Sequence, residues 1–350
     1  MPPLSAPEPA SPSIRKIVMR RAGGPDVFEI EEVPSPNPAA DEVVVQAEAI
    51  GVGWPDILIR RGIYKWMPPL PTSPGSDMAG RIVAVGDGVD PALIGQPVLL
   101  TARELKVRGG CYAERIAVPL AALFLLPQNA DLDAAVALPN YQVAWNLLYE
   151  APRGPMPRSL FINGVAGGVG SALAQLAKAE GLTVFGSVSS PEKAAFARRI
   201  GVDHPIDYRA EDIVEAVMAL TDGCGVDMAV DHLGGSGFSK LLGLLGNWGL
   251  LVSYNASAGL PQDNLLEALR NYGSRCLAIR IFEMHLYDAD AINRRRIMQQ
   301  VIDRWASGAF APAIAARLPF ADVALAHTMV ESGQACGKVI LKPGLVRMEN

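Results

Sequence analysis

Cysteine and histidine are scarce in this sequence. Four of its 350 residues are cysteine and four are histidine. The cysteines show no C-x-x-C spacing, which argues against a disulfide framework and against a four-cysteine zinc lobe. The histidines show no paired spacing of metal ligands either. These residues are Cys111, Cys224, Cys276 and Cys336, and His204, His232, His285 and His327. We therefore expect a reducing, cytoplasmic setting.

Clustered positive charge and long apolar runs are also missing. The net charge is −5, and no block of lysine and arginine occurs, so we expect no nucleic-acid partner. No segment has the unbroken apolar length of a membrane helix, so we expect no membrane partner. Residues 1–13 are rich in Pro, Ala and Ser and lack the basic start and apolar stretch of a signal peptide. We interpret them as a flexible leader.

What the sequence does contain is typical of a globular α/β protein. It is 50% hydrophobic and 19% charged, and its length suits two domains. Up to about residue 131, short strands alternate with Gly and Pro, which predicts a mostly β, barrel-like block. From residue 133 strands and helices alternate, which predicts a doubly wound parallel sheet. A final strand, helix and strand over 313–341 are expected to rejoin the first block. The first-block strands are predicted at 14–19, 42–49, 82–85, 97–101 and 112–118.

A glycine-rich turn lies between a predicted strand (160–163) and a predicted helix (171–180). Its pattern is G-x-x-G-G-x-G, beginning at Gly164, and Val165 stands where the strict G-x-G-x-x-G pattern has its first glycine. Such glycines let backbone N–H groups approach a pyrophosphate, and a helix N-terminus favours its charge. A tight turn without a ligand is the alternative. The predicted cofactor contacts are Gly164, Ala166, Gly167, Gly168, Val169 and Gly170.

The end of the next predicted strand (183–188) favours NADPH over NADH. NAD sites place an acid there for the ribose hydroxyls, whereas this chain has hydroxyl groups followed by a lysine. Ser189, Lys193 and Tyr208 are therefore predicted at a 2′-phosphate. Ser189 and Ser190 could instead cap the following helix, and both roles could hold together. The predicted cofactor contacts also include Tyr254, Phe282 and Lys338.

Six motifs carry a resemblance to a known family. They are 51–56 (GVGWPD), 61–64 (RGIY), 74–80 (PGSDMAG), 109–114 (GGCYAE), 166–170 (AGGVG) and 337–341 (GKVIL). The chain resembles the medium-chain dehydrogenase/reductase superfamily, in its zinc-independent quinone oxidoreductase (zeta-crystallin-like) branch, with enoyl-thioester reductases as close relatives. The resemblance implies a GroES-like catalytic domain (14–138 and 284–350), an inserted Rossmann domain (139–283) and a cleft between them. It also implies a homodimer that pairs along the strand near 276–282, and an exposed edge strand supports this.

The resemblance also predicts that no metal is bound. Zinc dehydrogenases of the superfamily hold their ion with a cysteine and a His-Glu pair, at the positions of Gly53, Ser76 and Asp77. Glycine has no ligand atom, and serine is a poor zinc ligand. Without a Lewis acid, alcohol oxidation is disfavoured, whereas hydride addition to a conjugated acceptor needs less help.

Tyr64 is the predicted catalytic residue, since a tyrosine at this place in the family faces the substrate and could donate to the developing enolate oxygen. The alternative is an aromatic ring that packs on Trp66 and Pro68. The chain departs from the family pattern at Gly53, where Asn is usual, and at Val143, where Thr is usual. The predicted substrate-cleft residues are Gly53, Trp54, Trp66, Asn140 and Gln142. Asp56 is expected to cap the first loop, and Arg60 and Arg61 to meet solvent or an acidic neighbour.

Three functions remain open at this point. The first is an NADPH-dependent reductase of quinones or α,β-unsaturated carbonyl compounds. The second is an enoyl-thioester reductase, which needs a cationic mouth that no obvious basic cluster in the sequence provides. The third is a non-catalytic NADPH-binding protein, because Gly53 and Val143 lack polar groups.

Overall fold

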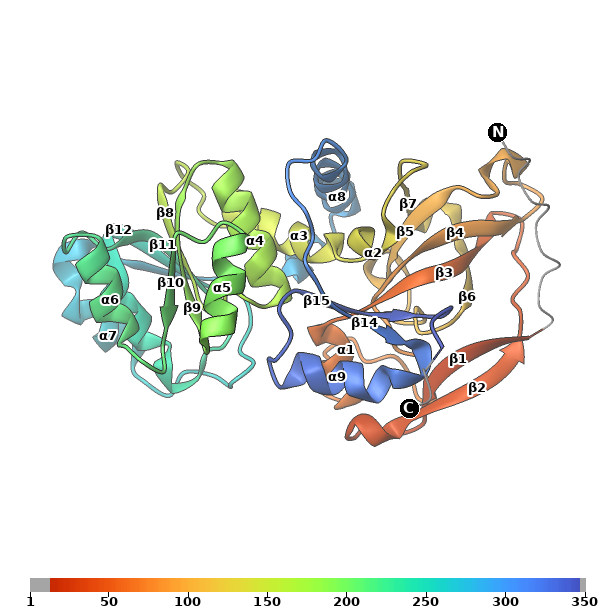
Figure 1. Cartoon of the computed structure of the whole chain (residues 1–350), viewed down its shortest axis with the longest axis horizontal. Helices are drawn as coiled ribbons and strands as arrows, with labels where there is room; N and C mark the ends of the chain where they lie inside the picture. Colours follow the sequence, from red (N-terminus) through yellow and green to blue (C-terminus); the bar gives the residue numbers. More distant parts are fainter. Residues whose placement is uncertain (1–12, 347–350) are drawn as a thin grey trace. The chain divides into compact units, whose positions relative to one another are not determined.

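The computed structural model describes residues 13–346, so the predicted leader lies outside it except for Ser13. The described chain forms two compact units (Figure 1). Unit 1 comprises residues 13–136, 316–334 and 339–346, and unit 2 comprises 137–315 and 335–338. Within these residues no helix is both long enough and apolar enough to cross a bilayer.

The second unit extends further along the chain than the predicted Rossmann domain, which was expected to end at 283. Helix α8 (Ala291–Ala306) belongs to it because it packs on α3 (Leu138–Trp145). Gln142 Nε2 on α3 donates a hydrogen bond of 2.8 Å to the carbonyl of Arg294 on α8. Residues 335–338 join the same unit, where the N–H of Gly337 donates to the carbonyl of Ala166 at 2.9 Å.

Unit 1 is built on a mainly antiparallel seven-stranded sheet, which confirms the predicted mostly β block. The order is β14-β15-β3-β4-β5-β7, and β6 pairs with β3. Figure 1 shows the blue strands β14 and β15 near the orange strand β3, and Val339 pairs with Val52. The tail therefore rejoins the first block as predicted. The strands are β3 (Glu42–Val52), β4 (Asp77–Val85), β5 (Pro97–Thr101), β6 (Arg115–Pro119), β7 (Leu123–Leu125), β14 (Ile314–Pro319) and β15 (Lys338–Lys342), and a separate hairpin is formed by β1 (Ser13–Met19) and β2 (Phe28–Pro34).

The helices of unit 1 include one that the sequence analysis missed. Helix α1 (Trp54–Arg60) begins after Gly53, and Pro55 lies in its first turn, where proline needs no hydrogen-bonded N–H. The Asp56 carboxylate caps this helix, as expected, by accepting from the N–H of Gly53 at 2.8 Å. The other helices are α2 (Leu132–Ala135) and α9 (Val323–Glu331).

Unit 2 contains a six-stranded parallel sheet in the order β10-β9-β8-β11-β12-β13, which confirms the doubly wound prediction. The helix expected over 238–245 is instead two 3-10 turns, η6 (Gly235–Gly237) and η7 (Ser239–Leu244). Glycine is a weak helix former, and three glycines fall in or beside this segment. The strands are β8 (Ser159–Ile162), β9 (Thr183–Val188), β10 (His204–Asp207), β11 (Val226–Asp231), β12 (Leu245–Ser253) and β13 (Ala278–Ile281), and the further helices are α4 (Gly168–Ala179), α5 (Pro191–Arg199), α6 (Ile213–Leu220) and α7 (Leu265–Asn271).

Candidate active site

The glycine-rich turn joins β8 to α4, at the point where the strand order of the sheet reverses. Strands β9 and β10 lie on one side of β8, and β11, β12 and β13 lie on the other. In open parallel sheets ligands bind outside the carboxyl ends of the strands at such a point. Gly167 precedes the first turn of α4, whose unpaired backbone N–H groups favour an anion.

The protein's own packing requires glycine at both ends of this turn. Gly164 has a φ of +73°, and a Cβ there would lie 2.5 Å from the His232 ring. A Cβ on Gly170 would lie 2.7 Å from the carbonyl oxygen of Gly164. Gly167 differs, because its Cβ would meet only that same oxygen, at 3.5 Å. The first and last glycines thus shape the turn, while Gly167 leaves room for a ligand to approach.

Val165 is fully buried and packs against the backbone of β9. A Cβ on Gly186 would lie 2.6 Å from the Val165 side chain. The valine therefore fills the space between the turn and the sheet, which accounts for the departure from the strict glycine pattern.

A buried hydrogen-bond chain fixes the turn to three strand ends. Asn163 Nδ2 donates to Asp231 Oδ1 at 2.7 Å, Ser187 Oγ donates to Asn163 Oδ1 at 2.6 Å, and the N–H of Gly164 donates to Ser187 Oγ at 2.7 Å. Asp231 has no exposed surface. The chain ties together β8, β9 and β11, and such satisfied polar networks make a site rigid. No sequence pattern predicts this network, since its members lie far apart along the chain.

We expect Gly170→Ala to weaken NADPH binding about ten-fold. The added Cβ has to displace the Gly164 backbone, and overpacking of this kind costs about 1–3 kcal/mol. Titration of NADPH fluorescence gives the Kd. Gly237→Ala is the control, because a Cβ there meets nothing within 4 Å. Equal affinities of the two variants would contradict the assigned role of Gly170.

The predicted 2′-phosphate residues come together at the start of α5. Lys193 Nζ donates to Ser189 Oγ at 2.9 Å. The N–H of Tyr208, whose side chain is 51% exposed, donates to the carbonyl of Val188 at 3.2 Å. Ser190 Oγ accepts from the N–H of Lys193 at 3.3 Å, so Ser190 also caps the helix. The capping role and the side-chain cluster therefore occur together.

The remaining predicted cofactor residues are tied to the same edge of the sheet. The N–H of Tyr254 donates to the Asp231 carbonyl at 3.0 Å, and burial raises the pKa of the Tyr254 phenol. The N–H of Phe282 donates to the Ser253 carbonyl at 2.8 Å. Lys338, which follows Gly337, is 3% exposed. The Gly337 backbone contacts the turn, and Tyr254 and Phe282 directly follow β12 and β13, but Phe282 and Lys338 offer little side-chain surface.

Two predicted substrate-cleft residues of α3 have different surroundings. Asn140 lies against the glycine-rich turn, because a Cβ on Gly168 would lie 2.5 Å from Asn140 Nδ2. Gln142 is 3% exposed, and its amide nitrogen is used in the bond to Arg294 described above. Asn140 therefore stays in the proposed site, whereas Gln142 holds two helices together.

In unit 1, Asp56 joins the two loops that carry the expected metal positions. Its Oδ1 accepts from Ser76 Oγ at 2.8 Å, while Oδ2 accepts from the N–H of Gly53. Gly53 has no side-chain atom that could bind a metal ion, and the Ser76 hydroxyl already forms a hydrogen bond to Asp56. Within residues 13–346, no group of three or more His, Cys, Asp or Glu side chains is placed to hold a metal ion. These residues do not fit a catalytic zinc.

Tyr64 and Trp66 form an aromatic pair with ring centroids 5.7 Å apart. Tyr64 also packs on the buried cluster of Met19, Val27 and Ile59, in addition to its predicted contact with Trp66. Both aromatic side chains keep part of their surface exposed, and so does Trp54. Half-buried aromatic rings of this kind suit a planar, apolar acceptor.

Two cations lie beside Trp66. This arrangement was not predicted from the sequence. Lys65 Nζ is 4.9 Å from the ring centroid, and Arg108 Cζ is 5.8 Å from it. Arg108 comes from a loop far along the chain, so the sequence does not show that it lies near Lys65. By contrast, Arg60 and Arg61 pair with Glu331 on α9, which confirms the expected acidic neighbour.

A buried hydrogen-bonded pair, Tyr112 and His327, was also not predicted from the sequence. Tyr112 Oη and His327 Nε2 are 2.9 Å apart, and neither side chain is exposed. Burial, with a smaller contribution from Arg60, lowers the pKa of His327 from 6.5 to about 3. The Phe28 ring lies 4.6 Å from the His327 ring and also packs on the cluster under Tyr64.

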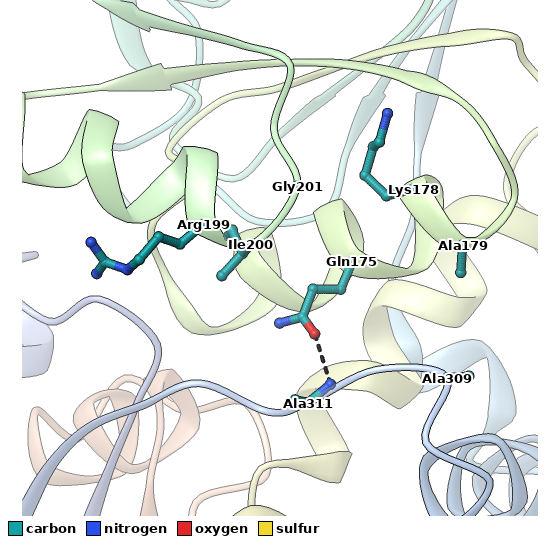
Figure 2. Close-up of a pocket in the computed structure, with 8 residues that line it drawn as sticks. All are labelled: Gln175, Lys178, Ala179, Arg199, Ile200, Gly201, Ala309 and Ala311. Carbon is teal, nitrogen blue, oxygen red and sulfur yellow. Dashed lines mark hydrogen bonds between the residues drawn. The ribbon is translucent and has the colours of Figure 1, made fainter.

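A separate cavity of about 440 Å³ lies in unit 2. Figure 2 shows the Gln175 side chain of α4 pointing to the backbone of Ala311, whose N–H donates to Gln175 Oε1 at 3.0 Å. None of the predicted site residues lines this cavity. We therefore do not place the acceptor there.

Known proteins resemble the chain along most of its length. Residues 39–128 match the family described as alcohol dehydrogenase GroES-like domain, and residues 200–341 match the family described as zinc-binding dehydrogenase. The synaptic vesicle membrane protein VAT-1 homolog of Rattus norvegicus is 31% identical over 95% of this chain and 85% of its own length. A quinone oxidoreductase of Pseudomonas aeruginosa is 31% identical over 94% of this chain and 99% of its own length.

Two further relatives are informative. A 2-haloacrylate reductase of Burkholderia is 28% identical over 93% of this chain and 98% of its own length. The crystal structure of Escherichia coli quinone oxidoreductase complexed with NADPH is 28% identical, covers 94% of this chain and 100% of its own, and superimposes with a TM-score of 0.81. With the two sheets and the glycine-rich turn at the switch point, these matches show that the chain belongs to the medium-chain dehydrogenase/reductase superfamily, in its quinone oxidoreductase branch.

Proposed function

We propose that this chain, an NADPH-dependent oxidoreductase, reduces a quinone or an α,β-unsaturated carbonyl compound without zinc. The donor set in unit 1 carries the proposal: Gly53 has no ligand atom, and Ser76 is bound to Asp56. The aromatic pair of Tyr64 and Trp66 suits a flat conjugated acceptor. The names of two relatives, a quinone oxidoreductase and a 2-haloacrylate reductase, support the same class of acceptor.

The residues of the turn would hold the cofactor. Backbone N–H groups at the start of α4 and the open space at Gly167 fit its pyrophosphate. Ser189, Lys193 and Tyr208 fit its 2′-phosphate, and Asn140 flanks the turn. When bound, NADPH would supply a hydride, which carries the two electrons of the reduction.

The chain's own side chains would act on the acceptor. In conjugate reduction the hydride adds to the β-carbon, the C=C electron pair moves towards the carbonyl oxygen, and the α-carbon takes a proton. Overall, acceptor, NADPH and one proton give NADP⁺ and the reduced acceptor, which is a saturated carbonyl compound from an enone and a hydroquinone from a quinone. The Tyr64 phenol would donate to the oxygen where negative charge develops, while Trp54 and Trp66 would hold the acceptor's apolar part.

Oxidation of NADPH, followed by its absorbance, tests this function with a panel of quinones and enones. We expect turnover of at least one acceptor in the presence of a chelator, with no stoichiometric zinc in the purified protein. Tight NADPH binding without turnover of any acceptor would favour a non-catalytic protein instead. Stoichiometric zinc would contradict the metal-free mechanism.

We expect Lys193→Gln to raise KM for NADPH about ten-fold and to leave KM for NADH nearly unchanged. A hydrogen bond to a charged group contributes about 1.5–3 kcal/mol, and only NADPH carries the 2′-phosphate. Arg198→Gln, an exposed cation on the same helix, is the control. Equal losses with both cofactors would remove Lys193 from the 2′-phosphate site.

We also propose that two copies pair along β13. In the described residues this strand has a neighbour on one side only, and Ile281 is 75% exposed. Unpaired edge strands of this kind favour association. Light scattering should therefore show a dimer for the natural chain and a monomer for Ile281→Lys, with Leu325→Lys on α9 as the control. A monomeric natural chain would refute the pairing.

A further inference from the structure

We propose that the acceptor carries an anionic group, bound chiefly by Lys65 with Arg108 nearby, beside the Trp66 ring. This rests on the proposed function and narrows its substrate class. The two cations belong to different segments of unit 1, and both lie within 6 Å of the same ring centroid. Tyr64, the proposed donor to the reacting carbonyl, contacts that ring as well.

Backbone contacts hold the Arg108 loop in place next to the Ser76 segment. The N–H of Gly110 donates to the Ser73 carbonyl at 2.8 Å, and the N–H of Cys111 donates to the Gly75 carbonyl at 3.2 Å. Gly109 has a φ of +152°, and a Cβ there would lie 2.9 Å from the Ser73 carbonyl oxygen. The Arg108 loop therefore lies beside the Ser76 segment, which is hydrogen-bonded to Asp56. This is the part of unit 1 where the acceptor is proposed to bind.

The segment that carries Arg108 is rich in cations, in a chain whose net charge is negative. Residues 103–108 (RELKVR) contain three cations and one carboxylate, Glu104, and Lys65 adds a further cation. Lys65 has no ion pair within residues 13–346, whereas Arg108 also interacts with other groups of the chain. Lys65 is therefore the residue that gains most from an anion, and Arg108 strengthens the positive field.

This arrangement matches a chemical need of anionic acceptors. An ionised carboxylate next to a conjugated carbonyl opposes the negative charge that hydride addition brings to the enolate. A fixed cation offsets that repulsion in the transition state. A carboxylate on the acceptor and a phosphate of an acyl thioester present the same negative charge to Lys65, so the test has an arm for each.

The test compares pairs of acceptors that share a reacting group and differ in charge. The first pair is trans-3-benzoylacrylic acid and its methyl ester, and the second is crotonyl-CoA and the neutral crotonyl thioester of N-acetylcysteamine. We expect kcat/KM of the natural chain to be about ten-fold higher for the anionic member of at least one pair, and to fall with added salt. A preference in the first pair identifies a carboxylate, and one in the second pair identifies a phosphate.

In Lys65→Gln we expect the anionic-to-neutral ratio of kcat/KM to fall to about one, because a single charged hydrogen bond accounts for a ten-fold preference. Lys240→Gln, an exposed lysine of unit 2, should keep the natural ratio. Turnover of the neutral acceptors with no charge preference would overturn this inference and leave the proposed function intact. No turnover of any acceptor would overturn the proposed function, and the inference with it.

Discussion

Tyr64→Phe should lower kcat about 10²–10³-fold with a conjugated acceptor, the usual effect of removing one donor to a developing oxyanion. The phenyl ring keeps its place on Met19, Val27 and Ile59 and beside Trp66, so only the hydroxyl group is lost. The substitution therefore separates the catalytic role from the packing role. Steady-state kinetics with saturating NADPH, together with the NADPH Kd, measure the effect.

Tyr149→Phe provides the matched control. Its phenol belongs to unit 2, where it donates to Glu180 Oε1 at 2.7 Å and accepts from Arg304 at 2.8 Å. We expect a modest loss of stability and an unchanged kcat. Full activity of Tyr64→Phe would show that Tyr64 serves only as a packing residue and would leave the proton donor unassigned.

His327→Gln should make the protein less sensitive to acid. The folded histidine has its pKa lowered to about 3, while the unfolded residue titrates near 6.5. Between these values the unfolded state binds the extra proton, so the free energy of unfolding falls as the pH falls through this window. From pH 7 to pH 4 the loss due to His327 amounts to about 3 kcal/mol. The glutamine variant lacks this titration and can still hydrogen-bond Tyr112.

Urea unfolding of both proteins at several pH values measures this effect. The difference in unfolding free energy between natural chain and variant should shift by about 3 kcal/mol in favour of the variant between pH 7 and pH 4. The contributions of the other titrating groups to the unfolding free energy are the same in both proteins, so they cancel in that difference. Phe320→Leu, a change at another fully buried position of unit 1, should give a constant difference. Parallel pH curves for His327→Gln would contradict the neutral state of His327.

Some elements escaped sequence analysis for identifiable reasons. Helix α1 is short and contains Pro55 and a tryptophan, so no helical spacing of apolar residues was visible in its sequence. The Asp56 side chain nevertheless caps its N-terminus. The predicted domain boundary at 283 differs from the observed end of unit 2, because the sequence did not show which unit α8 joins. Helix α8 has both polar and apolar side chains, and its packing partner, α3, comes from much earlier in the chain. Gln142 was placed in the cleft from its position, but its amide bonds to Arg294. Burial and pairing of this kind depend on distant residues.

The local features could be predicted from the residues alone. Glycine spacing defined the turn at Gly164, hydroxyl groups and Lys193 in place of an acid favoured NADPH, and Gly53 removed a metal ligand. Such features can be predicted because backbone conformation and side-chain chemistry act within a few residues. By contrast, the folded chain was needed to show that Arg108 and Lys65 both lie beside Trp66, and that Tyr112 hydrogen-bonds a neutral His327. Such pairs form when packing brings distant segments together, and burial then fixes their charge.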